Sequence, residues 1–292
     1  MDAHAGSDPG PAPMPPPLLE RLLPAGAPAS VAEIVAGLGL DERTVSLPGR
    51  PRVMLNMIST ADGRATLGGR SGAISDPADR ALFHGLRSAV DAVLAGAGTA
   101  RAEHYGRIVP NAERRAERVR RGLSEEPLAC IVSGRLALSP QEIPLLDEPA
   151  ASVAILTASA ASLPACAAHV CYVRAERDGR LDLAAALAEL GERFDVRSVL
   201  CEGGPHLAWE LLAGGLLDEL FLSLAPLLAG GESSGDQALR ILAGKELEPP
   251  VKLELLGALN SDSHLFLRYG VAAPERVSRE TMLSSSLAKR RP

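Results

Sequence analysis

Two glycine-rich turns, each placed directly after an apolar run, constrain the fold of this chain more than any other feature. The apolar run 92–95 leads into Gly96-Ala97-Gly98-Thr99, and the run 199–201 leads into Glu202-Gly203-Gly204-Pro205. Each reads as a buried strand whose end presents bare backbone N–H groups, and glycine lets the backbone approach an anion closely. Two such turns in one sheet indicate a ligand that carries a diphosphate or several phosphates.

Strand-like and helical patterns alternate along most of the chain, which predicts an α/β fold. The predicted sheet is mainly parallel and twisted, with helices on both faces and antiparallel strands at its C-terminal end. A helix begins at Asp76-Pro77, where a cap is followed by proline at the first helical position. Further helices are predicted at 183–190 and 205–212, and strands at 53–59, 92–95, 128–132, 153–157, 169–173, 199–201, 219–224, 252–256 and 265–269.

Composition predicts one main domain flanked by three segments of different character. The N-terminal segment is mostly Pro, Ala and Gly and is expected to be disordered, whereas the C-terminal tail is polar and basic and is expected to fray. Between the disordered segment and the main domain, two short helices at 18–23 and 30–38 are predicted to pack on that domain. The predicted divisions are 1–17 for the disordered segment, 18–50 for the helical extension, 51–270 for the main domain and 271–292 for the tail.

Charge, cysteine usage and hydropathy narrow the functional classes. The formal net charge of -6 argues against a nucleic-acid surface. The apolar stretch 211–228 contains Asp218 and Glu219, so no membrane span is expected. The four cysteines show no CxxC spacing and read as buried reduced thiols. With no signal-peptide pattern at the N-terminus, we expect a cytoplasmic protein.

The first glycine-rich turn is not a dinucleotide fingerprint of the Rossmann type. Arg101 stands where the third glycine should be, and no strand that ends in an acid follows about 20 residues on. A purely structural turn therefore remains an alternative at Gly96-Ala97-Gly98-Thr99.

The second turn is a stronger signal. Pro205 suits a first helical turn, and the preceding glycines leave N–H groups free for an anion. One exposed helix N-terminus contributes only about 0.3–1 kcal/mol to anion binding, so both turns or an arginine would be needed. Because the Glu202 carboxylate would repel a phosphate, we expect it to accept hydrogen bonds from amino or hydroxyl groups of a ligand.

A loop that follows the first strand has the composition of a ligand-covering loop. Ser59-Thr60-Ala61-Asp62-Gly63-Arg64 leads into Gly68-Gly69-Arg70-Ser71-Gly72, and such mobile glycine-rich loops often close over a bound molecule. Asp62 is the candidate for organising polar or proton-transfer contacts, and the alternative is a turn in which Asp62 bonds its own backbone. The segment 111–126, with five arginines, reads as a solvated helix or loop.

Five motifs in this order resemble the riboflavin-biosynthesis pyrimidine reductase family, over about residues 52–269. The segment Arg101-Ala102-Glu103-His104-Tyr105-Gly106 further resembles stand-alone actinobacterial-type members. The motifs are Ser59-Thr60-Ala61-Asp62-Gly63-Arg64, the stretch from Leu86-Arg87-Ser88 to Gly98-Thr99, Glu202-Gly203-Gly204-Pro205, Leu217-Asp218-Glu219-Leu220, and Ala225-Pro226-Leu227-Leu228-Ala229-Gly230-Gly231.

The resemblance implies a dihydrofolate-reductase-like fold, a homodimer and a hydride transfer from NADPH to C1′ of a ribosylaminopyrimidine 5′-phosphate. It implies that Arg87 binds the 5′-phosphate by charge-assisted hydrogen bonds, with an exposed helix cation as the alternative and Arg64 or Arg70 as substitutes. The implied substrate residues are Asn56, Ser71, Arg87 and Glu202. The implied NADPH residues are Ser59, Gly96, Gly98, Thr99, Glu103, Gly203, Gly204, Pro205 and His206.

The chain departs from the bifunctional members of that family at several positions. Asn56 stands where they have lysine, Ala73 stands where they have tryptophan, and a second family arginine is matched only nearby, by Arg107. The zinc-ligand spacing of their deaminase domain is absent, so no metal is expected. Two other functions therefore remain open: a reductase of a pterin or dihydrofolate, and a cofactor-binding protein without turnover.

Overall fold

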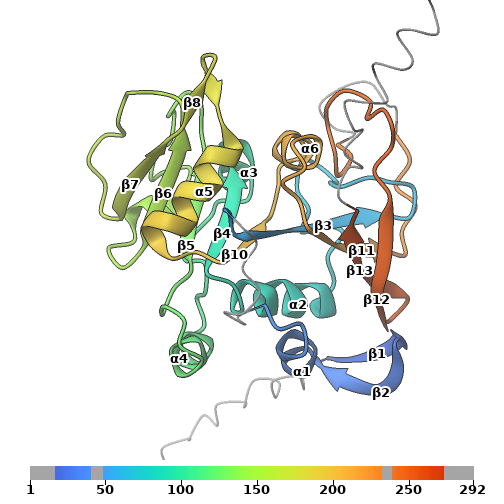
Figure 1. Ribbon diagram of the computed structural model, residues 1–292. Coiled ribbons are helices and arrows are strands. Elements are labelled where there is room, and N and C mark those ends of the chain that lie inside the picture. The colour runs from blue at the N-terminus through green and yellow to red at the C-terminus, as the bar shows by residue number, and fades with distance from the viewer. Residues whose placement is uncertain (1–16, 41–48, 232–238, 273–292) are drawn as a thin grey trace, which may run out of the picture.

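The computed structural model describes residues 17–40, 49–231 and 239–272. Most of its strands form one sheet in the order β2-β1-β12-β13-β11-β3-β10-β4-β5-β6-β7 (Figure 1). All pairs from β11 through to β7 are parallel, and all pairs on the β2 side of β11 are antiparallel. The predicted α/β class, with a mainly parallel sheet and antiparallel C-terminal strands, is confirmed.

Most strands in the parallel part of the sheet are apolar and buried, as expected for strands covered on both faces. Its two central strands, β10 (Ser198–Cys201) and β4 (Ala92–Gly96), are the ones that lead into the glycine-rich turns. The other parallel strands are β3 (Arg52–Thr60), β5 (Leu128–Val132), β6 (Ser152–Thr157), β7 (His169–Arg174) and β11 (Glu219–Ala225).

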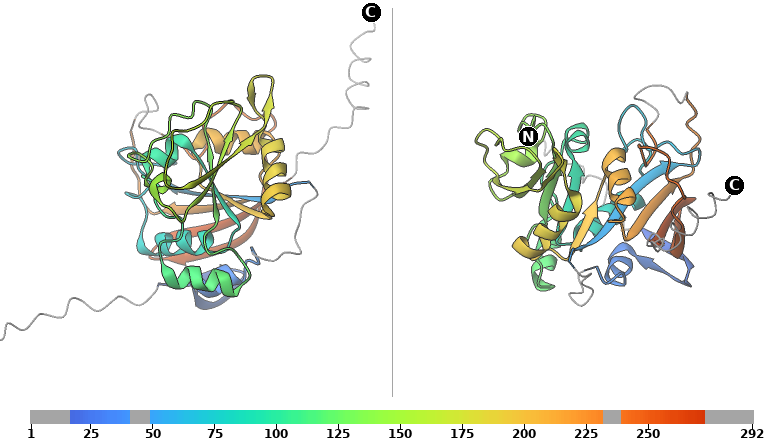
Figure 2. Two further views of the ribbon diagram at one scale, coloured as in Figure 1. Left: turned by 90° about the vertical axis from the view of Figure 1, so that its left-hand side faces the viewer. Right: turned by 45° about the horizontal axis from the view of Figure 1, so that its top comes forward.

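The antiparallel end joins the two ends of the chain. Strands β12 (Leu253–Ser261) and β13 (His264–Val271) pair with each other, and β1 (Leu18–Leu23) adds to the free edge of β12. Strand β2 (Ala25–Ser30) then pairs with β1. The views in Figure 2 agree in placing the blue N-terminal segment beside the red C-terminal strands.

Helices cover both faces of the sheet and divide the core into two clusters. On one face lie α1 (Val31–Ala36) and α2 (Pro77–Arg87), which contribute Ile34, Val35, Leu82 and Leu86 to the first cluster. On the other face lie α5 (Leu183–Phe194) and α6 (Pro205–Ala213), which contribute to the second. Three shorter or more exposed helices complete the set: α3 (Ala97–Ala102), α4 (Ala112–Arg120) and the 3₁₀ turn η1 (Pro144–Asp147). A small hairpin pairs β8 (Glu176–Arg177) with β9 (Arg180–Leu181).

The predicted elements of the main domain are confirmed, whereas one element of the extension is wrong. The expected helix at 18–23 is strand β1, because its backbone groups pair with β12 and β2. The expected helix at 30–38 is α1, which Ser30 and Glu33 begin with a capping box. Except for residues 17, 271 and 272, the segments 1–17 and 271–292 lie outside the described residues.

Candidate functional site

The two glycine-rich turns meet at the carboxyl edge of the parallel strands. The Gly96 N–H donates to the Gly203 carbonyl at 2.8 Å, and the Glu202 N–H donates to the Leu94 carbonyl at 2.9 Å. In open α/β sheets, ligands bind outside this edge. The pairing of β4 with β10 therefore brings the turns together, as their position after adjacent strands requires.

The backbone of the second turn requires glycine. Gly203 has a φ of +88°, a conformation that residues with a Cβ rarely adopt. A Cβ on Gly204 would lie only 2.9 Å from the Thr99 hydroxyl oxygen of the first turn. By contrast, a Cβ on Gly98 would meet no protein atom within 4 Å, so Gly98 borders open space.

Both turns end in helix N-termini that lack a side-chain cap. Gly96 begins α3 and Gly204 begins α6, and neither helix has a side-chain hydrogen bond at its N-cap. The first N–H groups of a helix lack intrahelical partners and favour negative charge. Together with the open space at Gly98, these N–H groups form an edge that favours an anionic group.

Arg87 and Glu202 bind each other in the interior behind the second turn. Arg87 Nε and Nη2 donate to the two Glu202 carboxylate oxygens, each at 2.7 Å, and Nη1 donates to the Ile108 carbonyl. The Tyr105 hydroxyl donates to the same Glu202 carboxylate. Burial alone would lower the pKa of Arg87, but the Glu202 charge outweighs it and the pKa is raised; burial raises the pKa of Tyr105.

These contacts involve the two side chains, Arg87 and Glu202, that were expected to bind substrate. Arg87 was expected to bind a 5′-phosphate and Glu202 to accept hydrogen bonds from a ligand, but the structure satisfies each with the other. The Arg87 guanidinium also stacks over the Phe83 ring, 4.2 Å from its centroid. In this structure the pair holds α2 to the Glu202 turn.

Asp62 ties the predicted covering loop to the segment after β11. Its carboxylate accepts from the Ala229 and Gly230 N–H groups, at 3.1 and 2.6 Å, and from the Thr60 hydroxyl at 2.5 Å. The Thr60 hydrogen bond and the two backbone ones lower the pKa of Asp62 from 3.8 to about 2. Asp62 is therefore ionised at neutral pH, and its hydrogen bonds organise polar contacts between the covering loop and the segment after β11.

Two other predicted residues also contact each other. The Ser71 N–H and hydroxyl donate to one Glu103 carboxylate oxygen, at 3.1 and 2.9 Å, and so fix the covering loop to the end of α3. Ser59 is buried at the end of β3 and donates to the Thr60 carbonyl. The exposed His206 lies in the first turn of α6. Asn56 lies deeper on β3 and lines a cavity on the α2 face of the sheet.

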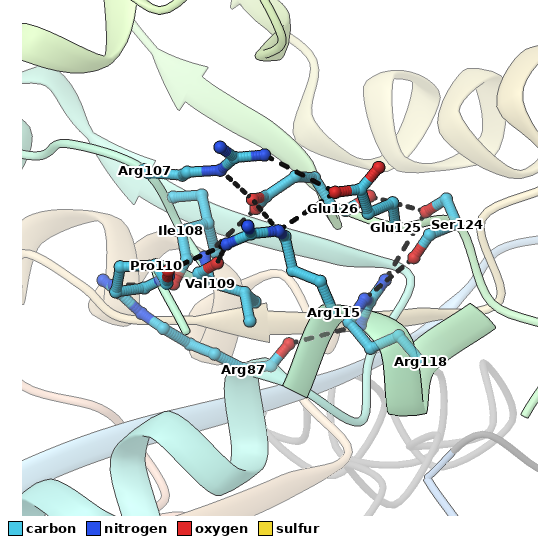
Figure 3. Close-up of polar contacts among 10 residues, drawn as sticks. All are labelled: Arg87, Arg107, Ile108, Val109, Pro110, Arg115, Arg118, Ser124, Glu125 and Glu126. Carbon is cyan, nitrogen blue, oxygen red and sulfur yellow. Dashed lines mark hydrogen bonds and ion pairs between the residues drawn. The ribbon is translucent and has the colours of Figure 1, made fainter. Parts of the chain in front are cut away.

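Sequence reasoning missed the interior role of the arginine-rich segment. Arg118 of α4, expected in solvent, is 1% exposed and donates from Nη1 to the carbonyl of Arg87, the last residue of α2 (Figure 3). The same Nη1 donates to the Val90 carbonyl. In the same cluster Arg107 and Arg115 bind Glu126 and Glu125 (Figure 3). Burial lowers the pKa of Arg118 to about 10, so it stays charged at neutral pH.

Tyr105 was also missed as a functional residue. It lies in the segment that marks the actinobacterial-type resemblance, but nothing in that segment's composition indicated a partner for its hydroxyl. Over the described residues, no group of His, Cys, Asp and Glu side chains is arranged to hold a metal ion. None of the helices in those same residues has the length and apolar character needed to span a bilayer.

The chain is similar to known proteins in both sequence and structure. Residues 51–265 match the model of the RibD C-terminal domain. The chain is 30% identical over 186 residues to the 2,5-diamino-6-ribosylamino-4(3H)-pyrimidinone 5′-phosphate reductase of Archaeoglobus fulgidus, covering 63% of this chain and 84% of that protein. The reductase of the same name from Methanothermobacter thermautotrophicus is 27% identical, with 76% of this chain and 99% of that protein covered.

A solved structure with the same fold is a pyrimidine reductase-like protein from Corynebacterium diphtheriae. Its TM-score to this chain is 0.67 at 23% identity, and the match covers 84% of this chain and all of that one.

Proposed function

The chain belongs to the RibD C-terminal domain family, and we propose that it is an NADPH-dependent reductase that converts a ribosylaminopyrimidine 5′-phosphate into the ribitylamino product. The two archaeal relatives are named as reductases of such a substrate. The observation that carries the proposal is the contact between the two glycine-rich turns, which sets two uncapped helix N-termini beside open space at Gly98.

The residues at this edge fit a dinucleotide. The N–H groups after Gly96 and Gly204 would bind the phosphates, and Thr99, which lies against Gly204, would hold the two turns in register. Ser59, Glu103 and His206 lie around the same edge and complete the proposed cofactor site. When bound, NADPH would supply the hydride for C1′.

The protein's own contribution is positioning and the exclusion of water. Asp62 fixes the covering loop to Ala229 and Gly230, and Ser71 fixes it to Glu103, so the loop is held at both ends. A reaction of two bound molecules gains most from such fixed geometry. Arg87 and Glu202 are proposed to bind substrate beside the second turn, and their contact with each other and with Tyr105 would fix the positions of both side chains.

A pterin or dihydrofolate is the second candidate substrate. Asn56 supports it, because a neutral amide here replaces the lysine of the bifunctional family members, and its side of β3 borders a mostly apolar cavity. An assay that follows NADPH oxidation by absorbance decides between the substrates. It is run with a ribosylaminopyrimidine 5′-phosphate, with dihydrofolate, and without substrate as the blank. If neither the pyrimidine nor dihydrofolate raises NADPH oxidation above the blank rate, the chain is a cofactor-binding protein without turnover.

Gly98→Val tests the cofactor site itself. The new side chain has room in the protein and would enter the space assigned to NADPH. We expect NADPH affinity, measured by calorimetry, to fall at least tenfold while the melting temperature stays within a few degrees. Gly106→Val is the matched control, since a Cβ there also meets nothing within 4 Å. Equal NADPH affinity in the parent and Gly98→Val would remove the assignment.

We propose further that the protein is a homodimer and works in the cytoplasm. Large leucine side chains are exposed at the antiparallel end of the sheet, where a second copy would cover them. They are Leu18, Leu22 and Leu23 of β1 and Leu253, Leu255 and Leu256 of β12.

A further inference from the structure

His264 joins the antiparallel end of the sheet to the segment that connects the covering loop with α2. It is the first residue of β13 and is buried, at 7% exposed. Its ring Nδ1 lies 3.2 Å from Oδ2 of Asp76, and its Nε2 lies 3.5 Å from the Ile74 carbonyl oxygen. One side chain of β13 therefore contacts both the connecting segment and the N-cap residue of α2.

Both ring nitrogens of His264 face hydrogen-bond acceptors. A carboxylate oxygen and a carbonyl oxygen accept hydrogens and donate none. A neutral imidazole carries a hydrogen on only one of its nitrogens, whereas the imidazolium carries one on each. The imidazolium is therefore the form that satisfies both contacts, and loss of its proton leaves one of them without a hydrogen.

The charged groups at the start of α2 favour the imidazolium. Asp76 is the only ionisable side chain that pairs with His264 in the described parts of the chain, and its other carboxylate oxygen accepts from the Asp79 N–H at 2.7 Å. The Asp79 carboxylate accepts from the Ser75 hydroxyl, and Arg80 donates to the Ser75 carbonyl. A helix N-terminus disfavours a cation, and the two carboxylates offset this effect.

The sheet side of the ring adds no buried charge. The Phe266 ring stacks on the His264 ring, with centroids 6.2 Å apart and planes inclined by 17°. Ser261 is the residue of β12 that pairs with His264. Asp262 lies in the turn between the two strands and is exposed. Asp76 is thus the buried side's counter-charge for His264.

The segment that His264 contacts lies next to residues that the proposed function assigns to substrate. The Ile74 N–H donates to the Ser71 carbonyl at 3.0 Å. Asp76 begins α2, the helix that ends at Arg87. Holding Ile74 and Asp76 in place fixes the covering loop relative to α2. It thereby fixes the spacing between Ser71 and Arg87.

We propose that His264, as the imidazolium, is a positioning residue that fixes the covering loop to the start of α2 for substrate binding. The inference rests on the proposed reductase function. Histidine is the side chain that ordinarily changes charge between about pH 5 and 8. The affinity for substrate is therefore highest at the acidic end of this range, where His264 is charged, and falls as the pH rises and the proton leaves.

Steady-state kinetics of the full chain at pH 6 and pH 8 test this role with His264→Gln, whose amide keeps a donor but carries no charge. We expect the KM for the phosphorylated ribosylaminopyrimidine to rise about fivefold at pH 6, the loss expected for one hydrogen bond, and by less than about twofold at pH 8. The kcat and the NADPH affinity should stay at the parent values.

Two further variants make the kinetic test specific. Asp76→Asn keeps an oxygen that can cap α2 but removes the carboxylate, so it should reproduce the pattern of His264→Gln, and the double variant should add nothing to it. His169→Gln is the matched control, because His169 is exposed on β7 at the far edge of the sheet. It should behave as the parent at both pH values.

Hydrogen exchange of residues 61–76, followed by mass spectrometry without substrate, reports on the loop independently of activity. At pH 6 these amides should exchange faster in His264→Gln than in the parent, and at pH 8 the two proteins should exchange alike. Equal exchange in the parent, His264→Gln and Asp76→Asn at pH 6 would overturn the proposal.

The kinetic outcomes separate this role from the reductase function. If the parent reduces the phosphorylated substrate and His264→Gln does so with the parent KM at pH 6, the positioning role is wrong and the function stands. A KM raised by the same factor at both pH values would give His264 a purely structural role and would also overturn the proposal. If the parent reduces neither the pyrimidine nor dihydrofolate, the reductase function and the substrate role of His264 fail together.

Discussion

At the scale of single residues, the Arg87–Glu202 pair shows how two predicted ligand contacts become an internal one. Their side chains are only 10% and 3% exposed. Removing one partner of a buried pair leaves an uncompensated charge and costs about 3–5 kcal/mol. Replacing both partners with apolar residues is often nearly neutral.

We therefore expect Arg87→Met to lower the free energy of unfolding by about 3–5 kcal/mol. The double variant Arg87→Met/Glu202→Leu should recover most of that loss, because no buried charge remains. Urea unfolding of the parent and both variants measures this. If Arg87→Met keeps the parent stability and loses only affinity for the phosphorylated substrate, Arg87 is a phosphate ligand after all.

Asp62 predicts a pH dependence of stability. Its folded pKa of about 2 lies below the ordinary value of 3.8, so its contribution is present above pH 4 and is lost as the pH falls toward 2. We expect Asp62→Asn to melt below the parent at pH 7 and the difference to shrink between pH 4 and pH 2. Thermal unfolding across that range checks this. A difference that stays constant down to pH 2 would show that the carboxylate charge does not hold the loop.

At the scale of secondary-structure elements, α4 is held by arginines, of which Arg118 is the most deeply buried. Arg118 lies beyond the end of α2 and binds the Val90 carbonyl at 2.7 Å, with further donors to the Arg87 and Ser124 carbonyls. Arg120, two residues on, is 63% exposed at its side chain and pairs only with Glu117 among the described residues.

Arg118→Met should consequently lower the free energy of unfolding by about 3 kcal/mol, because at least two charged hydrogen bonds are lost from the interior. Arg120→Met on the same helix should change it by no more than about 0.5 kcal/mol, as exposed pairs contribute little. Denaturant unfolding compares the two variants. Equal effects would mean that Arg118 is not held as the structure shows.

Elements that local pattern dictates were predictable, and elements that depend on distant pairing were not. The strands β4 and β10 are short apolar runs before glycines, and α2 begins with the Asp76 cap that the sequence indicated. Residues 18–23 place leucines at helical spacing, yet only Leu19 among them is buried, and β12 decides their conformation from over 200 residues away. The depth of Arg118 likewise has no local signal, because its carbonyl partners lie about 30 residues earlier.

The residues of the candidate site were likewise predictable from local patterns, whereas their distant partners were not. The glycine-rich turns and the loop residues Asp62 and Ser71 could be located from the sequence, because glycine and capping patterns are local. Their partners could not: Asp62 binds Gly230, and Arg87 binds Glu202 from 115 residues away. Which of two nearby charged groups faces a ligand and which faces the other group depends on packing that no motif records.

At the scale of the whole molecule, the antiparallel end of the sheet carries both the proposed dimer surface and one wall of the cavity that Asn56 lines. Leu253 and Leu255 are 44% and 42% exposed on β12, and large exposed apolar side chains that gather at one place are typical of association sites. Because β12 also lines the cavity through Leu256 and Gly257, a partner there would support the cavity wall from outside.

We expect Leu253→Glu/Leu255→Glu to shift the protein from dimer to monomer in sedimentation-velocity experiments at micromolar concentration, because two buried charges would oppose association. Val119→Glu is the control, since Val119 is 55% exposed on α4, away from this end. A parent that sediments as a monomer, or a leucine variant that remains a dimer, would contradict the proposed surface.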